Sequence, residues 1–156
     1  MKDTTRDTAG VIAPPPLIYA ATLGLALLLH QRVPLPIVPR KIKNLLGGIL
    51  IGGAIVPAFL AVRGMRKAGT NVNPTQPTTA LILEGPYRFT RNPIYLGMTA
   101  LYTGIAILAN TLWPILLLPG VLFVMTRGVI EREEAYLEQK FGEQYVTYKE
   151  KVRRWI

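Results

Sequence analysis

The chain has 156 residues, of which 50% are hydrophobic and 17% charged, and it contains no cysteine. A water-soluble domain of this size needs more charge to cover its surface, so the composition predicts an integral membrane protein of one domain, residues 1–156. Disulfides, thiolate nucleophiles and cysteine-bound metals are excluded, and the net charge of +9 is better explained by membrane topology than by a nucleic-acid partner.

Three long uncharged runs give the predicted helices: residues 8–29, 44–62 and 92–126. Because a membrane-spanning helix needs roughly 20 apolar residues, the first two runs each predict one span. The third run is too long for one span, and Asn110-Thr111 near its middle predicts a helical hairpin. We therefore expect an all-α, polytopic membrane helix bundle of four spans, over about residues 14–30, 44–62, 93–109 and 112–127.

The first two predicted helices carry proline and glycine signals. A Pro-Pro-Pro triplet at residues 14–16 precedes the first helix, where missing amide donors are tolerated. The second helix carries Gly48 and Gly52, four residues apart, and also Gly47 and Gly53; small residues at this spacing let helix backbones approach closely in lipid. We expect this contact within the chain, with a dimer contact as the alternative, so the protein is predicted to be a monomer or homodimer. The single histidine, His30, lies at the end of the first helix, and no metal site is expected there.

Most of the basic residues lie in two segments, residues 63–91 and 127–156. With four spans these segments share one face, and the positive-inside rule makes that face cytoplasmic. We expect the inner (cytoplasmic) membrane, with both termini and the active site on the cytoplasmic side. The polar loop at residues 69–80 is either a cover over a site or an ordinary connector, and the sequence leaves both interpretations open.

The stretch EGPYRFTRNPIYLG, residues 84–97, gathers polar and turn-forming residues just before the third helix. Its Asn-Pro step puts Pro93 at the first helical position. The free amides of this helix start, together with Arg91, can receive an anionic group. Tyr87 and Tyr95 offer aromatic faces for a purine or a cation. The alternative is a helix start with interfacial tyrosine and arginine anchors.

From Ile130 onward, apolar residues recur at intervals of three, four or seven. This spacing predicts a cytoplasmic amphipathic helix over about residues 129–154, with Gly142 as a position where it can bend. Glu133 and Glu134 lie along the apolar stripe, where a carboxylate is unfavourable unless it is paired or binds a ligand. They can hold the hydroxyl or ammonium groups of a ligand, pair with a nearby arginine, or lie exposed where the helix leaves the membrane.

Together, GPYRFTRNPIYLG and EREEAYLEQKFGEQYVTYKEKV, separated by the uncharged hairpin, resemble the isoprenylcysteine carboxyl methyltransferase family and its phospholipid methyltransferase relatives. The first family motif usually reads Gly-x-Tyr-x-x-x-Arg-His-Pro-x-Tyr-x-Gly. The second is a Glu-Glu pair followed by Leu and then Phe-Gly-x-x-Tyr-x-x-Tyr. The resemblance covers residues 84–152. The matching residues are Gly85, Tyr87, Arg91, Pro93, Tyr95, Gly97, Glu133, Glu134, Leu137, Phe141, Gly142, Tyr145 and Tyr148.

The resemblance implies a membrane-embedded methyltransferase that uses S-adenosylmethionine and releases S-adenosylhomocysteine. Asn92 stands where the family usually has histidine, and an amide keeps a hydrogen bond but cannot take up a proton near neutral pH. Carried over by position, the resemblance implies these cofactor-binding residues: Tyr87, Arg91, Asn92, Pro93, Tyr95, Gly97, Glu133 and Glu134.

Methyl transfer by direct displacement needs mainly positioning and exclusion of water. The candidate catalytic residues are Arg91, Glu134 and Arg153: either glutamate of the pair can offset a sulfonium charge, and either arginine can orient an anionic substrate. The expected partners are membrane lipids and a lipophilic or amphipathic acceptor (a carboxylate, an amine or a thiol) that arrives from the bilayer. Two alternatives remain open. One is a non-enzymatic, dimerising membrane scaffold, and the other is a nicotinamide-dependent membrane reductase, for which no separate dinucleotide fingerprint is present.

Overall fold

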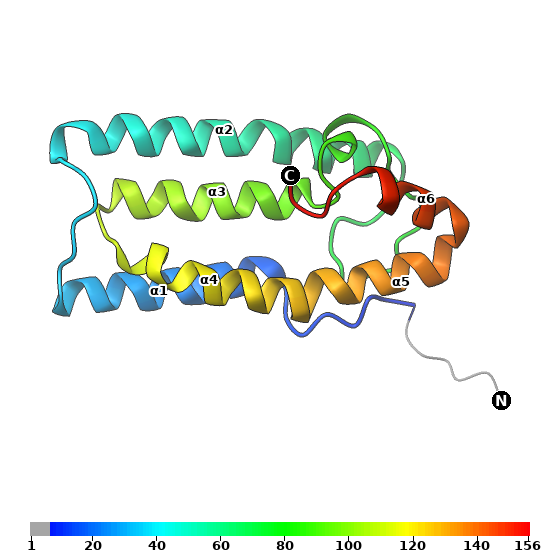
Figure 1. The fold of residues 1–156 in the computed structure, drawn as a ribbon, viewed down its shortest axis with the longest axis horizontal. Coiled ribbons are helices and arrows are strands. Elements are labelled where there is room, and N and C mark those ends of the chain that lie inside the picture. Colours follow the sequence, from blue (N-terminus) through cyan, green and yellow to red (C-terminus); the bar gives the residue numbers. More distant parts are fainter. Residues whose placement is uncertain (1–6) are drawn as a thin grey trace.

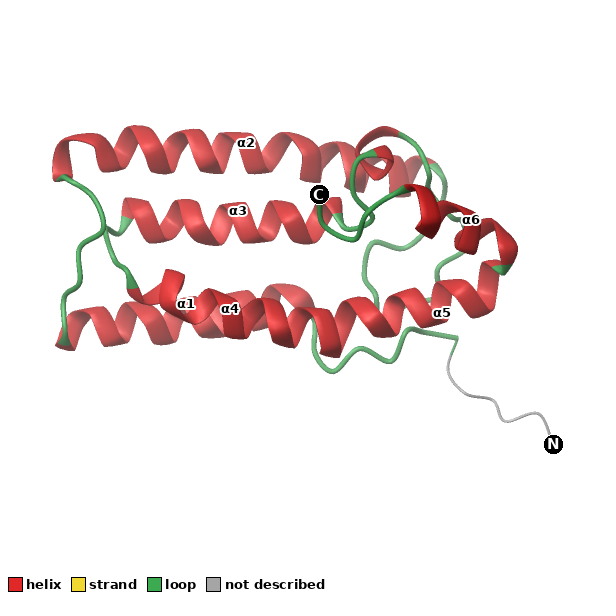
Figure 2. Cartoon of the chain, in the orientation of Figure 1, coloured by secondary structure: helices red, strands yellow, loops and turns green. Residues whose placement is uncertain are grey.

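The computed structural model describes residues 7–156, and over that range the chain is all-helical, without a strand (Figure 2). The all-α expectation is therefore confirmed. Figure 1 shows the long helices lying side by side and running in alternate directions. They are α1 (Pro15–Arg32), α2 (Arg40–Lys67), α3 (Pro93–Leu108) and α4 (Trp113–Met125), and a short 3-10 helix, η1 (Gly85–Arg88), precedes α3.

The last third of the chain differs from the predicted single helix over residues 129–154. A π-helical turn, η2 (Thr126–Ile130), joins α4 directly to α5 (Glu131–Phe141), so the helix does not begin anew at residue 129. Gly142 then adopts a φ of +54°, which ends α5, and α6 (Glu143–Lys151) follows in another direction. A positive φ is easy for glycine because it has no Cβ. The break turns α6 back, and residues 152–156 reach the beginning of α3 (Figure 1).

Two continuous helices are long and apolar enough to cross a membrane, Arg40–Lys67 and Trp113–Phe141. Only 17% and 33% of their most apolar windows are buried inside the protein, so most of their apolar surface faces outward, as in a lipid-facing helix. The outward side chains include Leu45, Ile49, Phe59 and Phe123. Helix α3 is apolar but shorter, and the count of four spans stays a prediction.

Helices α2 and α3 pack through glycines that leave room for the opposite backbone. A Cβ on Gly97 would lie 2.8 Å from the Cβ of Ala58, and one on Gly104 would lie 3.2 Å from the carbonyl oxygen of Gly47. Gly48 and Gly52 have no neighbouring atom within 4 Å of such a Cβ. The expected close contact within the chain therefore exists, but it uses Gly47 and not the predicted pair, which lies on another face of α2.

At the end of the bundle remote from η1, Asn110 forms the turn between α3 and α4. Its φ is +52°, a left-handed conformation that asparagine tolerates better than most residues. Its side-chain Oδ1 accepts hydrogen bonds of 3.0 Å from the amides of Ile37 and Val38, which ties the α1–α2 connection to this turn. The predicted helical hairpin is confirmed, and its return brings α5 beside the start of α3.

Candidate active site

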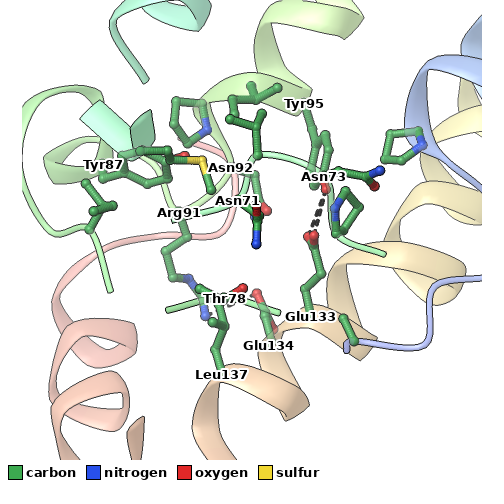
Figure 3. A pocket seen from close by; sticks show the side chains of 18 of the residues that line it. Asn71, Asn73, Thr78, Tyr87, Arg91, Asn92, Tyr95, Glu133, Glu134 and Leu137 are labelled. Atoms are coloured by element: carbon green, nitrogen blue, oxygen red, sulfur yellow. Dashed lines mark hydrogen bonds and ion pairs between the residues drawn. The ribbon is translucent and has the colours of Figure 1, made fainter. Parts of the chain in front are cut away.

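A cavity of about 400 Å³ lies between the start of α3, helix α5, and the connections around them. This volume is within the range of small-molecule sites. Its polar lining includes Arg91, Asn92 and Tyr95 on one side and Glu133 and Glu134 on the other. Figure 3 shows the two glutamates extending from α5 toward Arg91, Asn92 and Tyr95. The fold thus brings the two sequence motifs to one cavity.

Glu133 has a tyrosine hydroxyl as its hydrogen-bond donor. The hydroxyl of Tyr95 lies 2.8 Å from Oε1 and 2.9 Å from Oε2 of Glu133 (Figure 3). Glu133 lies beyond the uncharged part of its helix, which ends at Thr126. The pKa of Glu133 is raised to about 7, mainly by burial; the hydrogen bond from Tyr95 lowers this pKa and the nearby carboxylate of Glu134 raises it. A carboxyl group with this pKa exchanges its proton near neutral pH, and a cation in the cavity would favour its ionised form.

Glu134 lies between two arginines. The Nε and Nη2 atoms of Arg154 donate to its Oε1 and Oε2 at 3.0 and 2.7 Å, which is a two-point pair. Nη1 of Arg91 lies 3.1 Å from Oε1 of Glu134, but Nε and Nη1 of Arg91 are buried and have no hydrogen-bond partner among residues 7–156. A buried donor without an acceptor costs about 1–3 kcal/mol. The guanidinium of Arg91 is therefore suited to accept an anionic ligand.

Asn92 is buried and holds a neighbouring part of the backbone. Its side-chain Nδ2 donates to the carbonyl oxygen of Arg154 at 2.9 Å, and the hydroxyl of Thr90 donates to the same oxygen at 3.1 Å. The backbone amide of Arg91 donates to the carbonyl oxygen of Arg153 at 2.9 Å. Pro93, also buried, begins α3 and lines the cavity. These bonds hold residues 153–154 against the start of α3.

The polar loop at residues 69–80 lies over the cavity and contributes Asn71, Asn73 and Thr78 to its lining (Figure 3). The amide of Thr78 donates to the hydroxyl of Tyr136 on α5 at 3.1 Å. The same hydroxyl donates to the carboxylate of Asp7 at 2.8 Å, so one α5 side chain fastens both the loop and the segment before α1. Of the two interpretations of this loop, the structure favours the cover.

Three tyrosines form the wall between η1 and α6. The hydroxyl of Tyr148 donates to the carbonyl oxygen of Tyr87 at 2.7 Å, which holds η1 against α6. Burial, and to a smaller extent the carboxylate of Glu134, raise the pKa of Tyr145 to about 12. Burial also raises the pKa values of Tyr87 and Tyr148. All three hydroxyls are therefore neutral near pH 7 and act as hydrogen-bonding and aromatic surfaces, not as bases.

Two of the predicted site residues lie outside the cavity. Gly97 is buried against α2, where its missing side chain allows the contact with Ala58, so the structure gives it a packing role. The side chain of Arg153 is exposed, and only its backbone carbonyl takes part, through the bond from Arg91. The other predicted residues all line the cavity: Tyr87, Arg91, Asn92, Pro93, Tyr95, Glu133 and Glu134.

The profile of the phospholipid methyltransferase family matches residues 42–144. This chain belongs to the phospholipid methyltransferase family. The match covers most of α2 and all of α3, α4 and α5. It includes Arg91, Tyr95 and both glutamates of the cavity but not Tyr145 or Tyr148, and membership implies a membrane-associated methyltransferase. An uncharacterized protein of Haemophilus influenzae is 46% identical over 55 residues, which are 32% of this chain and 87% of that protein. No solved structure matches the chain.

Sequence reasoning missed one charged residue of this phospholipid methyltransferase family site, Arg154. The sequence predicts its neighbour Arg153 as a residue that orients an anionic substrate, and no spacing rule distinguishes these two adjacent basic residues. Tyr145 and Tyr148 belong to the second motif but were not predicted to line the cavity, which they do. Their spacing of three residues in α6 was the available signal, since it puts both on one face of a helix.

Proposed function

We propose that this protein is a membrane methyltransferase that uses S-adenosylmethionine to methylate a lipophilic or amphipathic acceptor reached from the bilayer. The observation that carries the proposal is that one cavity is lined by a positively charged group, Arg91, and by an acidic group, Glu133. Arg91 has buried donors without hydrogen-bond acceptors, and Glu133 has a tyrosine as its donor and no ion pair with a basic residue among residues 7–156.

The lining residues fit this cofactor by charge. S-adenosylmethionine carries a carboxylate, an ammonium and a sulfonium, so its site needs one cationic and at least one anionic group. Arg91 would hold the carboxylate with its free donors. Glu133 would be ionised beside the cationic groups and would balance their charge. The partly exposed aromatic ring of Tyr87 is available for the adenine.

When bound, the cofactor supplies an activated methyl group that a nucleophile attacks in a direct displacement. The protein contributes orientation and a dry environment. Tyr95 fixes the Glu133 carboxylate by contacts to both oxygens, which keeps the negative charge at one place. The loop at residues 69–80 covers the cavity and limits access of water from that side.

The class of acceptor is argued from the apolar part of the cavity. Pro14, Pro16, Ile94 and Met98 line it on the side of α1 and α3, and this surface suits an alkyl chain better than a small polar molecule. We propose that the acceptor offers a carboxylate, an amine or a thiol to the cofactor while its apolar portion lies along these helices. We further propose that the cavity end of the bundle faces the cytoplasm, in line with the basic segments at that end.

The test is a calorimetric or thermal-shift titration of the protein in detergent with S-adenosylmethionine, S-adenosylhomocysteine and NADPH. We expect the first two to bind and to stabilise the protein, and NADPH to have no effect. Binding of NADPH alone would support the reductase alternative, and no binding by any of the three would support the scaffold. A screen of lipophilic carboxylates, amines and thiols with radiolabelled methyl donor then identifies the acceptor class.

A further inference from the structure

Arg154 belongs to a segment whose position is fixed by the start of α3. Three donors from consecutive residues bind the backbone of this segment: the hydroxyl of Thr90 and the amide group of Asn92 to the carbonyl of Arg154, and the backbone amide of Arg91 to the carbonyl of Arg153. Trp155 packs against the hydrophobic core on the other side of Arg154. The contacts of the backbone and of Trp155 thus position the guanidinium of Arg154 next to Glu134.

Glu134 is shared unequally between its two arginines. Arg154 occupies both carboxylate oxygens, at 3.0 and 2.7 Å, in the two-point arrangement that is strongest for this pair of groups. Arg91 approaches the same carboxylate to 3.1 Å, yet its Nε and Nη1 lack hydrogen-bond geometry to any partner in the described part of the chain. Arg154 therefore prevents Glu134 from pairing with Arg91 in the same two-point way.

We propose that Arg154 is a positioning residue for cofactor binding: by holding Glu134 at both oxygens, it keeps the Arg91 guanidinium available for the carboxylate of the cofactor. This inference rests on the proposed function. Without Arg154, Glu134 turns to Arg91, satisfies its donors, and competes with the ligand carboxylate for them. Asn92 and Thr90 take part indirectly, because they fix the backbone from which Arg154 reaches Glu134.

The experiment compares two ligands that differ in the amino-acid group. S-adenosylhomocysteine carries it, whereas 5′-methylthioadenosine has the same adenosine and thioether without the carboxylate. Arg154→Gln should lower the affinity for S-adenosylhomocysteine at least tenfold, measured by titration calorimetry in detergent. Its affinity for methylthioadenosine should stay within twofold of that of the original protein. The matched control is Lys151→Gln, which removes one positive charge from an exposed position nearby and should leave both affinities unchanged.

A second variant separates this role from a purely structural one. In Glu134→Gln/Arg154→Gln the competing carboxylate is gone, so S-adenosylhomocysteine should bind more tightly than to Arg154→Gln alone. If Arg154→Gln does not fold, the comparison is made with Arg154→Lys, which keeps the charge but loses the two-point contact and should show the same selective loss to a smaller degree.

Three results would overturn the role of Arg154. They are an equal loss of affinity for both ligands in Arg154→Gln, an unchanged affinity for S-adenosylhomocysteine, and an affinity of the double variant for S-adenosylhomocysteine as low as that of Arg154→Gln. A protein without any substitution that fails to bind S-adenosylhomocysteine would instead overturn the proposed function itself, so the two failures are distinguishable.

Discussion

Helix α3 has two faces that are built in opposite ways. Toward α2, Gly97 and Gly104 bring the backbones so close that an added methyl group meets atoms of the neighbouring helix. Toward α5, the helix and the residues just before it present Tyr95 and Arg91 to a cavity, with polar groups that are only partly satisfied. One face is defined by close backbone contact. The other is defined by polar groups at a cavity, where the Tyr95 hydroxyl is hydrogen-bonded and Arg91 has donors without acceptors. The first sequence motif supplies Gly97 to the packing face and Arg91 and Tyr95 to the cavity, so its residues belong to two different classes.

The largest effect on the cavity face is expected from Arg91→Ala. Removing a charged partner of a buried carboxylate ligand typically costs 2–5 kcal/mol, so affinity for S-adenosylhomocysteine should fall by about 100-fold, which corresponds to roughly 2.7 kcal/mol. Titration calorimetry measures it. Glu134 keeps Arg154 as a partner, so the midpoint of thermal unfolding should change little. An affinity within threefold of the original would remove Arg91 from the cofactor site.

The packing face is tested by Gly97→Val. A Cβ at this position would lie 2.8 Å from the Cβ of Ala58 and 3.2 Å from the carbonyl oxygen of Ala54, and such overpacking costs about 1–3 kcal/mol. We expect a lower midpoint of thermal unfolding in detergent. The matched control is Gly48→Ala on the same helix pair, which has free space around it and should unfold at the same or a higher temperature. Equal midpoints for the two variants would contradict the assigned packing.

The protonation of Glu133 gives a smaller and pH-dependent effect. Its pKa in the folded protein is about 7, above the ordinary 4.5. Between pH 4.5 and pH 7, Glu133 therefore takes up a proton when the protein folds. The free energy of unfolding of the ligand-free protein should therefore fall as pH rises from 4.5 to 7 and level off above 7. Burial is the main cause of the raised pKa; of the neighbouring groups, Tyr95 from α3 lowers it and Glu134 from α5 raises it.

Ligand binding should respond to pH in the opposite sense. The cationic cofactor favours ionised Glu133, and the ionised fraction rises about tenfold between pH 6 and pH 8 for a pKa near 7. The affinity for S-adenosylmethionine should increase by about the same factor over this range, measured by calorimetry. Glu133→Gln should bind with little pH dependence. A pH dependence that persists in this variant would show that another group titrates.

Much of the fold and the meeting of the two motifs could be predicted from the sequence, because each depends on strong local signals. Asn110 in the middle of an uncharged run specifies a turn, and the resulting hairpin must return the chain to the start of α3. The break at Gly142 was harder to predict, since a glycine in an amphipathic pattern is compatible with a bent helix as well as with two helices. The choice of Gly47 over Gly48 depends on the rotation of α2, for which glycines on several faces give no preference.

The adjacent residues Arg153 and Arg154 show why the remaining site residue could not be predicted. Val152 has the extended backbone angles φ −120° and ψ 128°, and in an extended chain successive side chains point to opposite sides. Which arginine reaches the glutamate therefore depends on a shift of one residue, and that shift is set by distant partners, Thr90 and Asn92. The residues next to Arg153 and Arg154 in the sequence do not indicate which of the two side chains points toward Glu134.

The smallest expected effect follows from this alternation. Arg153→Ala removes an exposed side chain and keeps the backbone carbonyl that accepts the hydrogen bond from Arg91. Cofactor affinity and methyl-transfer rate should therefore change by less than about twofold, because exposed charges outside a site contribute little. Parallel kinetics of Arg153→Ala and Arg154→Ala make the comparison direct. A large loss in the first variant would mean that the exposed side chain contacts the acceptor, and the original hypothesis for Arg153 would stand.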